Sequence, residues 1–334
     1  TLPRIDILWG NALLFTYLLV AFISLFLINL NSYSEIRSSF LKRMVPVLPF
    51  FTQFSLGALF SGYFIFYARS ASFSLTWLFL LILIVLLFGN DFLKNRYQRF
   101  EFQTGILFLA TFFFTIFYIP IVMKEIGMTP FLVSGVVSLV LITAFVAMSS
   151  RVLGENFKKV RNTVLVIILG IYGFINLLYI ANIIPPIPLA LKESGVYHTL
   201  TKSPDGTYLV LSEQKTWFDF KEYYAPVVFY RYKGEPVYFF SAIFSPADLN
   251  TTILHEWQYF DVVSDSWVTT DRLRFEIAGG RDQGYRGYTF KQSMSPGLYR
   301  TNVITKEGQI LGRTQFRVVD VDQKQNLSPK ILGE

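Results

Sequence analysis

Six long apolar segments occupy the first 184 residues and limit the possible fold more than any other feature. A helix needs roughly 20 mainly apolar residues to cross the hydrocarbon core of a bilayer. Each segment meets that length, and its central part lacks Asp, Glu, Lys, Arg and His. We therefore expect six transmembrane helices, over about residues 7–30, 46–68, 73–90, 104–123, 130–149 and 162–184.

Charge is divided unevenly along the chain. Residues 1–184 carry 13 Lys and Arg against 6 Asp and Glu, whereas residues 185–334 carry 17 of each sign, so the net charge of +7 belongs to the first half. The basic residues are concentrated in alternate loops, and such loops stay cytoplasmic under the positive-inside rule. The pattern predicts an extracytoplasmic C-terminal half and no nucleic-acid partner. It also places Thr1 outside, which favours a further segment upstream.

Short β-rich runs separated by turns begin at about residue 206, a spacing typical of a sandwich or barrel. The clearest run alternates apolar and polar residues over 310–318, and we expect it to pair with 298–305 through a turn at 306–308. Two aromatic residues fit an immunoglobulin-like sandwich, Trp257 as the central core aromatic and Tyr299 as the anchor of a strand corner.

These observations predict an α+β membrane protein, with a six-helix transmembrane bundle followed by an extracytoplasmic all-β immunoglobulin-like sandwich. The expected domains are a transmembrane domain at 1–184, a Pro-rich membrane-proximal tether at 185–205, the β-sandwich at 206–320 and a polar C-terminal tail at 321–334.

A Gly-rich stretch, residues 278–291, carries the strongest local signature in the second half. Its backbone amides and basic side chains can hold a phosphate, a carboxylate or an acidic glycan. The alternative is an ordinary tight turn in which Arg281 and Asp282 pair with each other or cap the backbone. The candidate ligand- or partner-binding residues are Arg281, Asp282, Tyr285, Arg286, Tyr288 and Lys291.

The second apolar segment contains two pairs of small residues four apart, Gly57 with Ser61 and Ala58 with Gly62. Small residues at this spacing let another helix approach closely. We expect these residues to serve packing within the bundle, with an interface between copies of the chain as the alternative.

Motifs for catalysis or metal binding are missing from the sequence. His255-Glu256 is followed by Tyr259 where a zinc protease motif requires a second histidine, and His198 is the only other histidine in the chain. We expect His255 to be a histidine at the edge of the core or at an interface, with a hydrogen-bond partner. No catalytic residue, metal or cofactor is predicted.

Several short motifs together resemble a bacterial membrane-protein family. They are residues 185–189, 192–198, 255–257, 279–282 and 284–288. Over residues 185–320 the chain resembles proteins with a C-terminal domain of unknown function, number 2914, and its helical half is similar to the uncharacterised membrane region that often precedes that domain. The resemblance implies a multi-pass protein of the bacterial inner membrane with a periplasmic β domain, and it implies no activity.

The function that these features favour is that of a noncatalytic membrane subunit or scaffold. Its sandwich is expected to bind a partner protein or an envelope polymer. The expected partners of the whole chain are membrane lipid, a protein partner or a second copy of the chain, and an anionic or glycan ligand. One alternative is an enzyme acting on lipid-linked or envelope glycans, which requires Asp282, Arg286 and His255 to meet in one cleft. The other is a transporter or channel, although only amides and hydroxyls are available to line its path.

Overall fold

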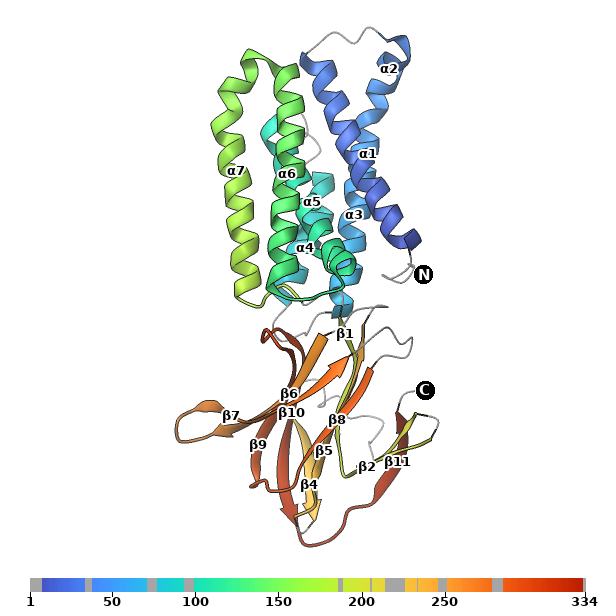
Figure 1. The fold of residues 1–334 in the computed structure, drawn as a ribbon, viewed down its shortest axis with the longest axis vertical. Coiled ribbons are helices and arrows are strands. Elements are labelled where there is room, and N and C mark those ends of the chain that lie inside the picture. Colours follow the sequence, from blue (N-terminus) through green and yellow to red (C-terminus); the bar gives the residue numbers. More distant parts are fainter. Residues whose placement is uncertain are drawn as a thin grey trace. The chain divides into compact units, whose positions relative to one another are not determined.

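The fold is seen in a computed structural model, which describes residues 8–33, 38–70, 77–92, 99–185, 189–204, 206–213, 226–232, 234–245, 251–277 and 285–332 (Figure 1). The described helices form one compact unit, and the described strands from Leu189 onward form a second.

The first unit consists of long apolar helices and one short helix. Five of the described helices are long and apolar enough to cross a membrane, by length and composition. The element bounds are α1 (Leu8–Tyr33), α2 (Ser39–Met44), a 3₁₀ turn (Val45–Val47), α3 (Leu48–Ser70), α4 (Trp77–Phe92), α5 (Phe100–Met123), α6 (Met128–Leu153) and α7 (Glu155–Ile180).

The third predicted span, residues 73–90, is described from Trp77 onward. Its helix, α4, has 16 residues, and its apolar part, Trp77–Phe88, is below the length that a simple crossing requires. The apolar run ends there because Gly89, Asn90 and Asp91 follow. The flanking residues 71–76 and 93–98 lie outside the described residues.

Helix α5 lies at the centre of the helical unit and contacts α1, α6 and α7. Phe108, Phe112 and Phe117 on this helix are fully buried. Polar contacts also join it to its neighbours, because Asn29 on α1 donates a 2.7 Å hydrogen bond to Gln103 and Tyr63 on α3 donates one of 3.0 Å to the carbonyl of Ala110. Aromatic packing with a few satisfied polar pairs therefore holds the bundle together.

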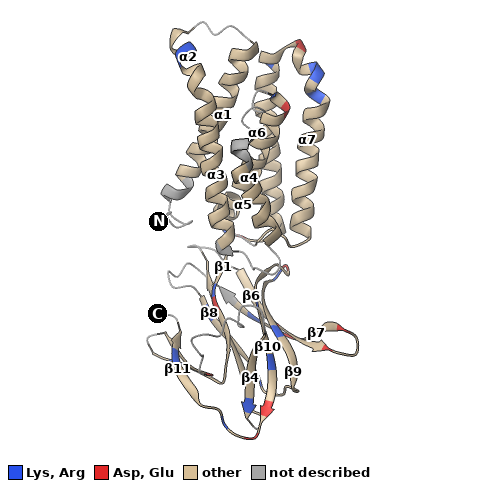
Figure 2. Ribbon diagram, turned by 180° about the vertical axis from the view of Figure 1, so that it is seen from behind, with Lys and Arg blue, Asp and Glu red and all other residues tan. Residues whose placement is uncertain are grey.

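Basic side chains lie at one end of the helical unit. Figure 2 shows Lys and Arg on α2 and at the start of α7 at the same end, where the sequence places Lys42 and Arg43 on α2 and Lys158 and Lys159 on α7. These residues belong to two of the alternate basic loops on which the predicted orientation depends.

The second unit contains three sheets, with strand orders β1-β5-β8, β4-β10-β9-β6-β7 and β11-β3-β2. The strand bounds are β1 (Ala190–Tyr197), β2 (Thr199–Lys202), β3 (Tyr208–Glu213), β4 (Val227–Tyr232), β5 (Val237–Phe244), β6 (Thr251–Asp261), β7 (Ser266–Ile277), β8 (Tyr285–Lys291), β9 (Gly297–Thr305), β10 (Ile310–Val321) and β11 (Leu327–Leu332).

The predicted hairpin is confirmed as β9 and β10, which pair antiparallel. Gly308 in the connecting turn has a φ of 84°, a conformation that glycine adopts without strain. The predicted alternation fails at Leu311, which is buried rather than wet. A β-bulge between Ile310 and Gly312 shifts the register there and turns Leu311 inward.

Sheet β1-β5-β8 faces the five-stranded sheet across an aromatic core. Trp257 on β6 is fully buried, as we expected, and packs edge-on against Phe239 of β5 and Phe316 of β10. The opposite face of β1-β5-β8 packs against the third sheet through a smaller cluster that includes Phe240, Tyr208 and Leu332. The middle sheet is therefore covered on both faces.

Two segments differ from the sequence expectation. Residues 190–202, expected in the tether, contain β1 and β2, and residues 327–332, expected in a polar tail, form β11. Strand β1 pairs with β5 and β11 pairs with β3. Both strands pair with strands that are distant in the sequence. This pairing provides hydrogen-bond partners for their backbone N–H and C=O groups.

Candidate functional site

The candidate site is the outer face of the five-stranded sheet, the face turned away from the aromatic core. Strand alternation places His255 and Trp257 inward, and Glu256 and Gln258 outward. Register then aligns two polar rows across four strands. One row is Arg313, Asn302, Glu256 and Arg272, and the other is Gln315, Arg300, Gln258 and Thr269.

Hydrogen bonds join these rows into one network, which we call the arginine face. Glu256 accepts bonds from Arg272 Nε at 2.8 Å and from Asn302 Nδ2 at 2.8 Å. Asn302 Oδ1 accepts from Arg313 Nε at 2.7 Å. Gln258 accepts from Arg300 Nε at 2.5 Å and donates to Thr269 at 2.9 Å. Arg300 and Arg313 are therefore held in place through their Nε atoms, whereas Arg272 also pairs with Glu256 through Nη2 at 2.7 Å.

The arginine face has more cationic than anionic groups. Glu256 is the one carboxylate in the described network, and it faces the guanidinium groups of Arg272, Arg300 and Arg313. Burial, and then the nearby charge of Arg313, lower the pKa of Arg300 to about 10, while Glu256 opposes the shift. Burial also lowers the pKa of Arg313. The uncompensated positive charge makes this face suited to an anion.

An aromatic side chain fixes one of the arginines. The Arg300 guanidinium lies over the Trp267 ring, 4.2 Å from its centroid, and Phe260 packs edge-on against the same ring. Trp267 lies on β7 in the hairpin with β6, which projects beyond its neighbours in Figure 1. Stacking together with a hydrogen bond leaves the guanidinium little freedom.

The core beneath this face contains a neutral histidine. His255 is fully buried, and burial lowers its pKa to about 3. Its Nε2 lies 2.7 Å from Ser241 Oγ and its Nδ1 lies 3.0 Å from Thr289 Oγ1, the atom to which Trp257 Nε1 also donates. The prediction of a hydrogen-bonded histidine is confirmed, although its position is central rather than at the edge of the core.

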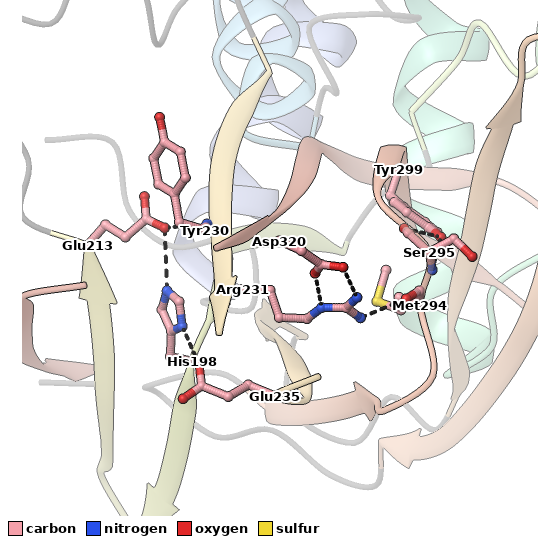
Figure 3. A network of polar contacts seen from close by, with 9 residues as sticks. All are labelled: His198, Glu213, Tyr230, Arg231, Glu235, Met294, Ser295, Tyr299 and Asp320. Atoms are coloured by element: carbon pink, nitrogen blue, oxygen red, sulfur yellow. Dashed lines mark hydrogen bonds and ion pairs between the residues drawn. The ribbon is translucent and has the colours of Figure 1, made fainter. Parts of the chain in front are cut away.

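A second polar network lies at β4 and the neighbouring strand ends (Figure 3). The buried Arg231 binds both carboxylate oxygens of Asp320, at 2.7 and 3.0 Å, and donates to the Met294 carbonyl. His198 stacks on Phe229, and its ring nitrogens each lie 3.4 Å from a carboxylate, one of Glu213 and one of Glu235. These contacts connect β4 to β10, and the residue between β1 and β2 to the end of β3.

Tyr299 forms the strand corner that we expected. Its hydroxyl donates to the Ser295 carbonyl at 3.0 Å and accepts from the Ser295 N–H at 3.2 Å (Figure 3). The tyrosine therefore closes the turn that leads into β9.

The predicted ligand-binding residues are only partly described. Arg281 and Asp282 lie outside the described residues. Residues 285–291 form strand β8 rather than part of a loop, because their aromatic and β-branched side chains favour strands and pair with β5. Tyr285 and Lys291 lie on one face of β8, and Arg286 and Tyr288 lie on the other.

Contacts within the domain engage the described members of this set. Arg286 Nη1 donates to the Gly206 carbonyl at 2.8 Å, and Lys291 binds Thr270 and Asp271. Tyr288 packs with Tyr208 and Tyr238. Arg286 and His255 lie on opposite faces of the β1-β5-β8 sheet, so these two members of the enzyme hypothesis do not share a cleft.

Gly62, one of the predicted helix-packing residues, packs against the first helix. A Cβ at Gly62 would lie 3.0 Å from Leu14 Cδ2 of α1, so glycine permits this approach. Gly57, Ala58 and Ser61 are half-buried on the same helix. Among the residues that the structure describes, no group of three or more His, Asp or Glu side chains is placed to hold a metal ion.

Comparisons with known proteins give one family match. Residues 250–318 match the family described as "Protein of unknown function (DUF2914)". This range is narrower than the 185–320 over which we expected the resemblance, and it contains β6 to β9 and most of β10. No curated protein matches the chain.

Two of the solved structures that match have low TM-scores. A β-glucosidase from Listeria innocua in complex with gluconolactone is 12% identical, with 39% of this chain and 16% of that chain covered and a TM-score of 0.22. The Pseudomonas fluorescens alkylpurine DNA glycosylase AlkC, bound to DNA with an abasic site analog, is also 12% identical, with 95% and 100% covered and a TM-score of 0.25.

Sequence reasoning missed Arg300 and Arg313 as a pair. The alternation of 310–318 already places Arg313 on the wet face, and the same rule applied to the preceding strand places Arg300 there. Only the strand register shows that Glu256 and Asn302 connect them.

Proposed function

We propose that this chain is a noncatalytic membrane-anchored binding module, in which a helical anchor presents an immunoglobulin-like sandwich outside the bacterial inner membrane. Several features support an immunoglobulin-like assignment. The order β10-β9-β6-β7 matches strands G-F-C-C′, and β1-β5-β8 matches A-B-E. The buried Trp257 and the corner formed by Tyr299 occupy the corresponding strands.

The single observation that carries the proposed function is the arginine face. Three guanidinium groups are fixed by a buried Glu256, Gln258 and Asn302, and Arg272 remains 61% exposed. Burying polar groups in a fixed network costs free energy unless every bond is made. A sheet face that orders its cations in this way favours binding of an anionic partner, either a protein or an envelope polymer.

The orientation belongs to the same proposal. The basic ends of α2 and α7 favour a cytoplasmic position for that end of the helical unit. The C-terminal domain then follows the last helix on the extracytoplasmic side, where an envelope polymer is accessible.

The experiment is purification of the full-length protein from its native membranes in a gentle detergent. The material retained by the wild type is compared with that retained by the double variant Arg300→Ala, Arg313→Ala. The matched control is Lys306→Ala, Lys330→Ala, which removes the same charge from side chains that are each 55% exposed elsewhere. Proteins are identified by mass spectrometry and glycans by sugar analysis.

We expect a stoichiometric component that remains with the wild type and the control and is lost from the double variant. Equal retention by the double variant, with its near-ultraviolet circular dichroism unchanged, would refute a role for the arginine face. A wild type that retains no component would refute the binding module itself.

A further inference from the structure

The Nη atoms of Arg300 and Arg313 are available to donate hydrogen bonds to a ligand. Each uses its Nε atom to bind the sheet, Arg300 to Gln258 and Arg313 to Asn302. Within the described part of the chain, no hydrogen-bond acceptor is provided for the Nη atoms of either residue. The Nη1 and Nη2 pair of a guanidinium matches the two oxygens of a carboxylate.

Among the described residues, Glu256 is the one carboxylate that faces these two guanidinium groups, so positive charge is in excess. The two residues are diagonal neighbours on adjacent strands, since Arg313 pairs with Asn302 and Arg300 pairs with Gln315. Glu256 already binds Arg272 and Asn302. A carboxylate placed between Arg300 and Arg313 would relieve the repulsion of two half-buried cations.

Further arginines extend the same face in both directions. Arg272 lies on β7 at one side, and the exposed Arg317 lies on β10 at the other. Neighbouring strands are about 4.8 Å apart, so β7 and β10, three strand spacings apart, are separated by about 14 Å. That length suits an extended polymer with repeated charges better than a single small anion.

The centre of the face disfavours a protein partner. Stable protein interfaces usually have an apolar core surrounded by a polar rim. Here the centre consists of Glu256, Gln258 and Asn302, and the aromatic Trp267 lies to one side under Arg300. A hydrated, repeatedly charged chain can bind such a surface through the arginines alone.

We propose that the arginine face binds a linear polysaccharide that carries carboxylate groups, of the polyuronate class, with Arg300 and Arg313 as the central carboxylate clamp. This inference rests on the proposed binding function and names the chemical class of its ligand. Arg272 and Arg317 contact the neighbouring sugar units.

The test uses full-length protein in detergent micelles and oligogalacturonate as the probe. The neutral control ligand is the same oligomer with its carboxylates methyl-esterified. Affinity is measured by titration calorimetry at several salt concentrations. We expect the wild type to bind only the charged oligomer, with affinity that falls as salt is added.

Three variants make the test specific. Arg300→Ala with Arg313→Ala is expected to weaken binding at least about tenfold, and the charge-matched Lys306→Ala with Lys330→Ala is expected to bind like the wild type. Arg300→Lys with Arg313→Lys keeps the charge without the fork geometry, so we expect an intermediate loss. The lysine variant also keeps the test valid if the alanine variant does not fold.

Other outcomes overturn the inference. Equal binding of the esterified oligomer, or unchanged binding by the folded alanine variant, would refute the carboxylate clamp. Preference for polyglutamate would indicate an acidic protein partner, and binding only to vesicles that contain phosphatidylglycerol would indicate a lipid surface. If no oligomer binds but the native-membrane component is still lost from the alanine variant, the binding module stands and the polysaccharide assignment fails.

Discussion

Asn302 donates a 2.8 Å hydrogen bond to Glu256 across β9 and β6, and both side chains are almost completely buried on the outer face of the five-stranded sheet. The amide also accepts from Arg313, so a single side chain connects the carboxylate to a guanidinium on the next strand. Because Asn302 bonds to both charged groups, its side chain holds them in fixed positions. Loss of this side chain would therefore also lower the stability of the domain.

Replacing this amide tests that coupling. We expect Asn302→Ala to lower the free energy of unfolding by about 1–3 kcal/mol, because Glu256 and Arg313 each lose a partner in a buried site. The control Gln315→Ala, half-buried on the same face, should change it little. Urea unfolding of the sandwich followed by tryptophan fluorescence measures both. Equal effects would show that Asn302 is no more important than its neighbour.

Acid should weaken the domain through His255. Its pKa is about 3 in the folded protein and 6.5 in the reference state, so the unfolded chain binds more protons between these values. Stability is therefore present above pH 6.5 and is lost as the pH falls towards 3, with a slope of up to about 1.4 kcal/mol per pH unit.

The substitution His255→Gln removes this titration while keeping a hydrogen-bonding side chain. We expect a lower stability at pH 7 and a shallower fall between pH 6 and pH 4 than in the wild type, measured by urea unfolding at each pH. An unchanged slope would show that other groups cause the acid sensitivity.

The corner at Tyr299 should contribute through its hydroxyl. We expect Tyr299→Phe to destabilise the sandwich by about 1–2 kcal/mol, because the N–H and the carbonyl of Ser295 lose their partner. Tyr259→Phe is the matched control, since Tyr259 packs against Tyr299 through its ring. Thermal unfolding distinguishes them, and a control that is as damaging as Tyr299→Phe would contradict a specific role for the corner.

Helix packing at Gly62 can be tested against another helical glycine. Gly62→Leu places a side chain where even a Cβ would lie 3.0 Å from Leu14, so we expect the detergent-solubilised bundle to melt at a lower temperature. Gly170→Leu is the control, because a Cβ at Gly170 has no neighbour within 4 Å. If Gly62→Leu instead dissociates an oligomer without lowering the melting temperature, the glycine lies at an interface between copies.

Much of the fold was predictable because it depends on local patterns. Long apolar runs predicted five helices that are long and apolar enough to cross a membrane, and alternation with a glycine turn predicted the hairpin of β9 and β10. The described part of the third predicted span, α4, runs past the expected end at residue 90, because apolar length alone does not show where a helix ends. Strands β1 and β11 were missed because their partners, β5 and β3, lie far away in the sequence. Strand β2 pairs with the neighbouring β3, and it was missed because the tether was expected to extend to residue 205.

The division into an apolar helical half and a charge-balanced β half follows from the amino-acid sequence alone, because solvent preference and backbone periodicity are local properties of the chain. Which polar residues act together depends on how the strands pair in the folded domain. Glu256, Arg300 and Arg313 come from three different strands, and they form one network because strand register brings them side by side. Local alternation places Arg300 and Arg313 on a wet face, but register depends on long-range backbone pairing, so no local pattern shows that Glu256 lies in the same network.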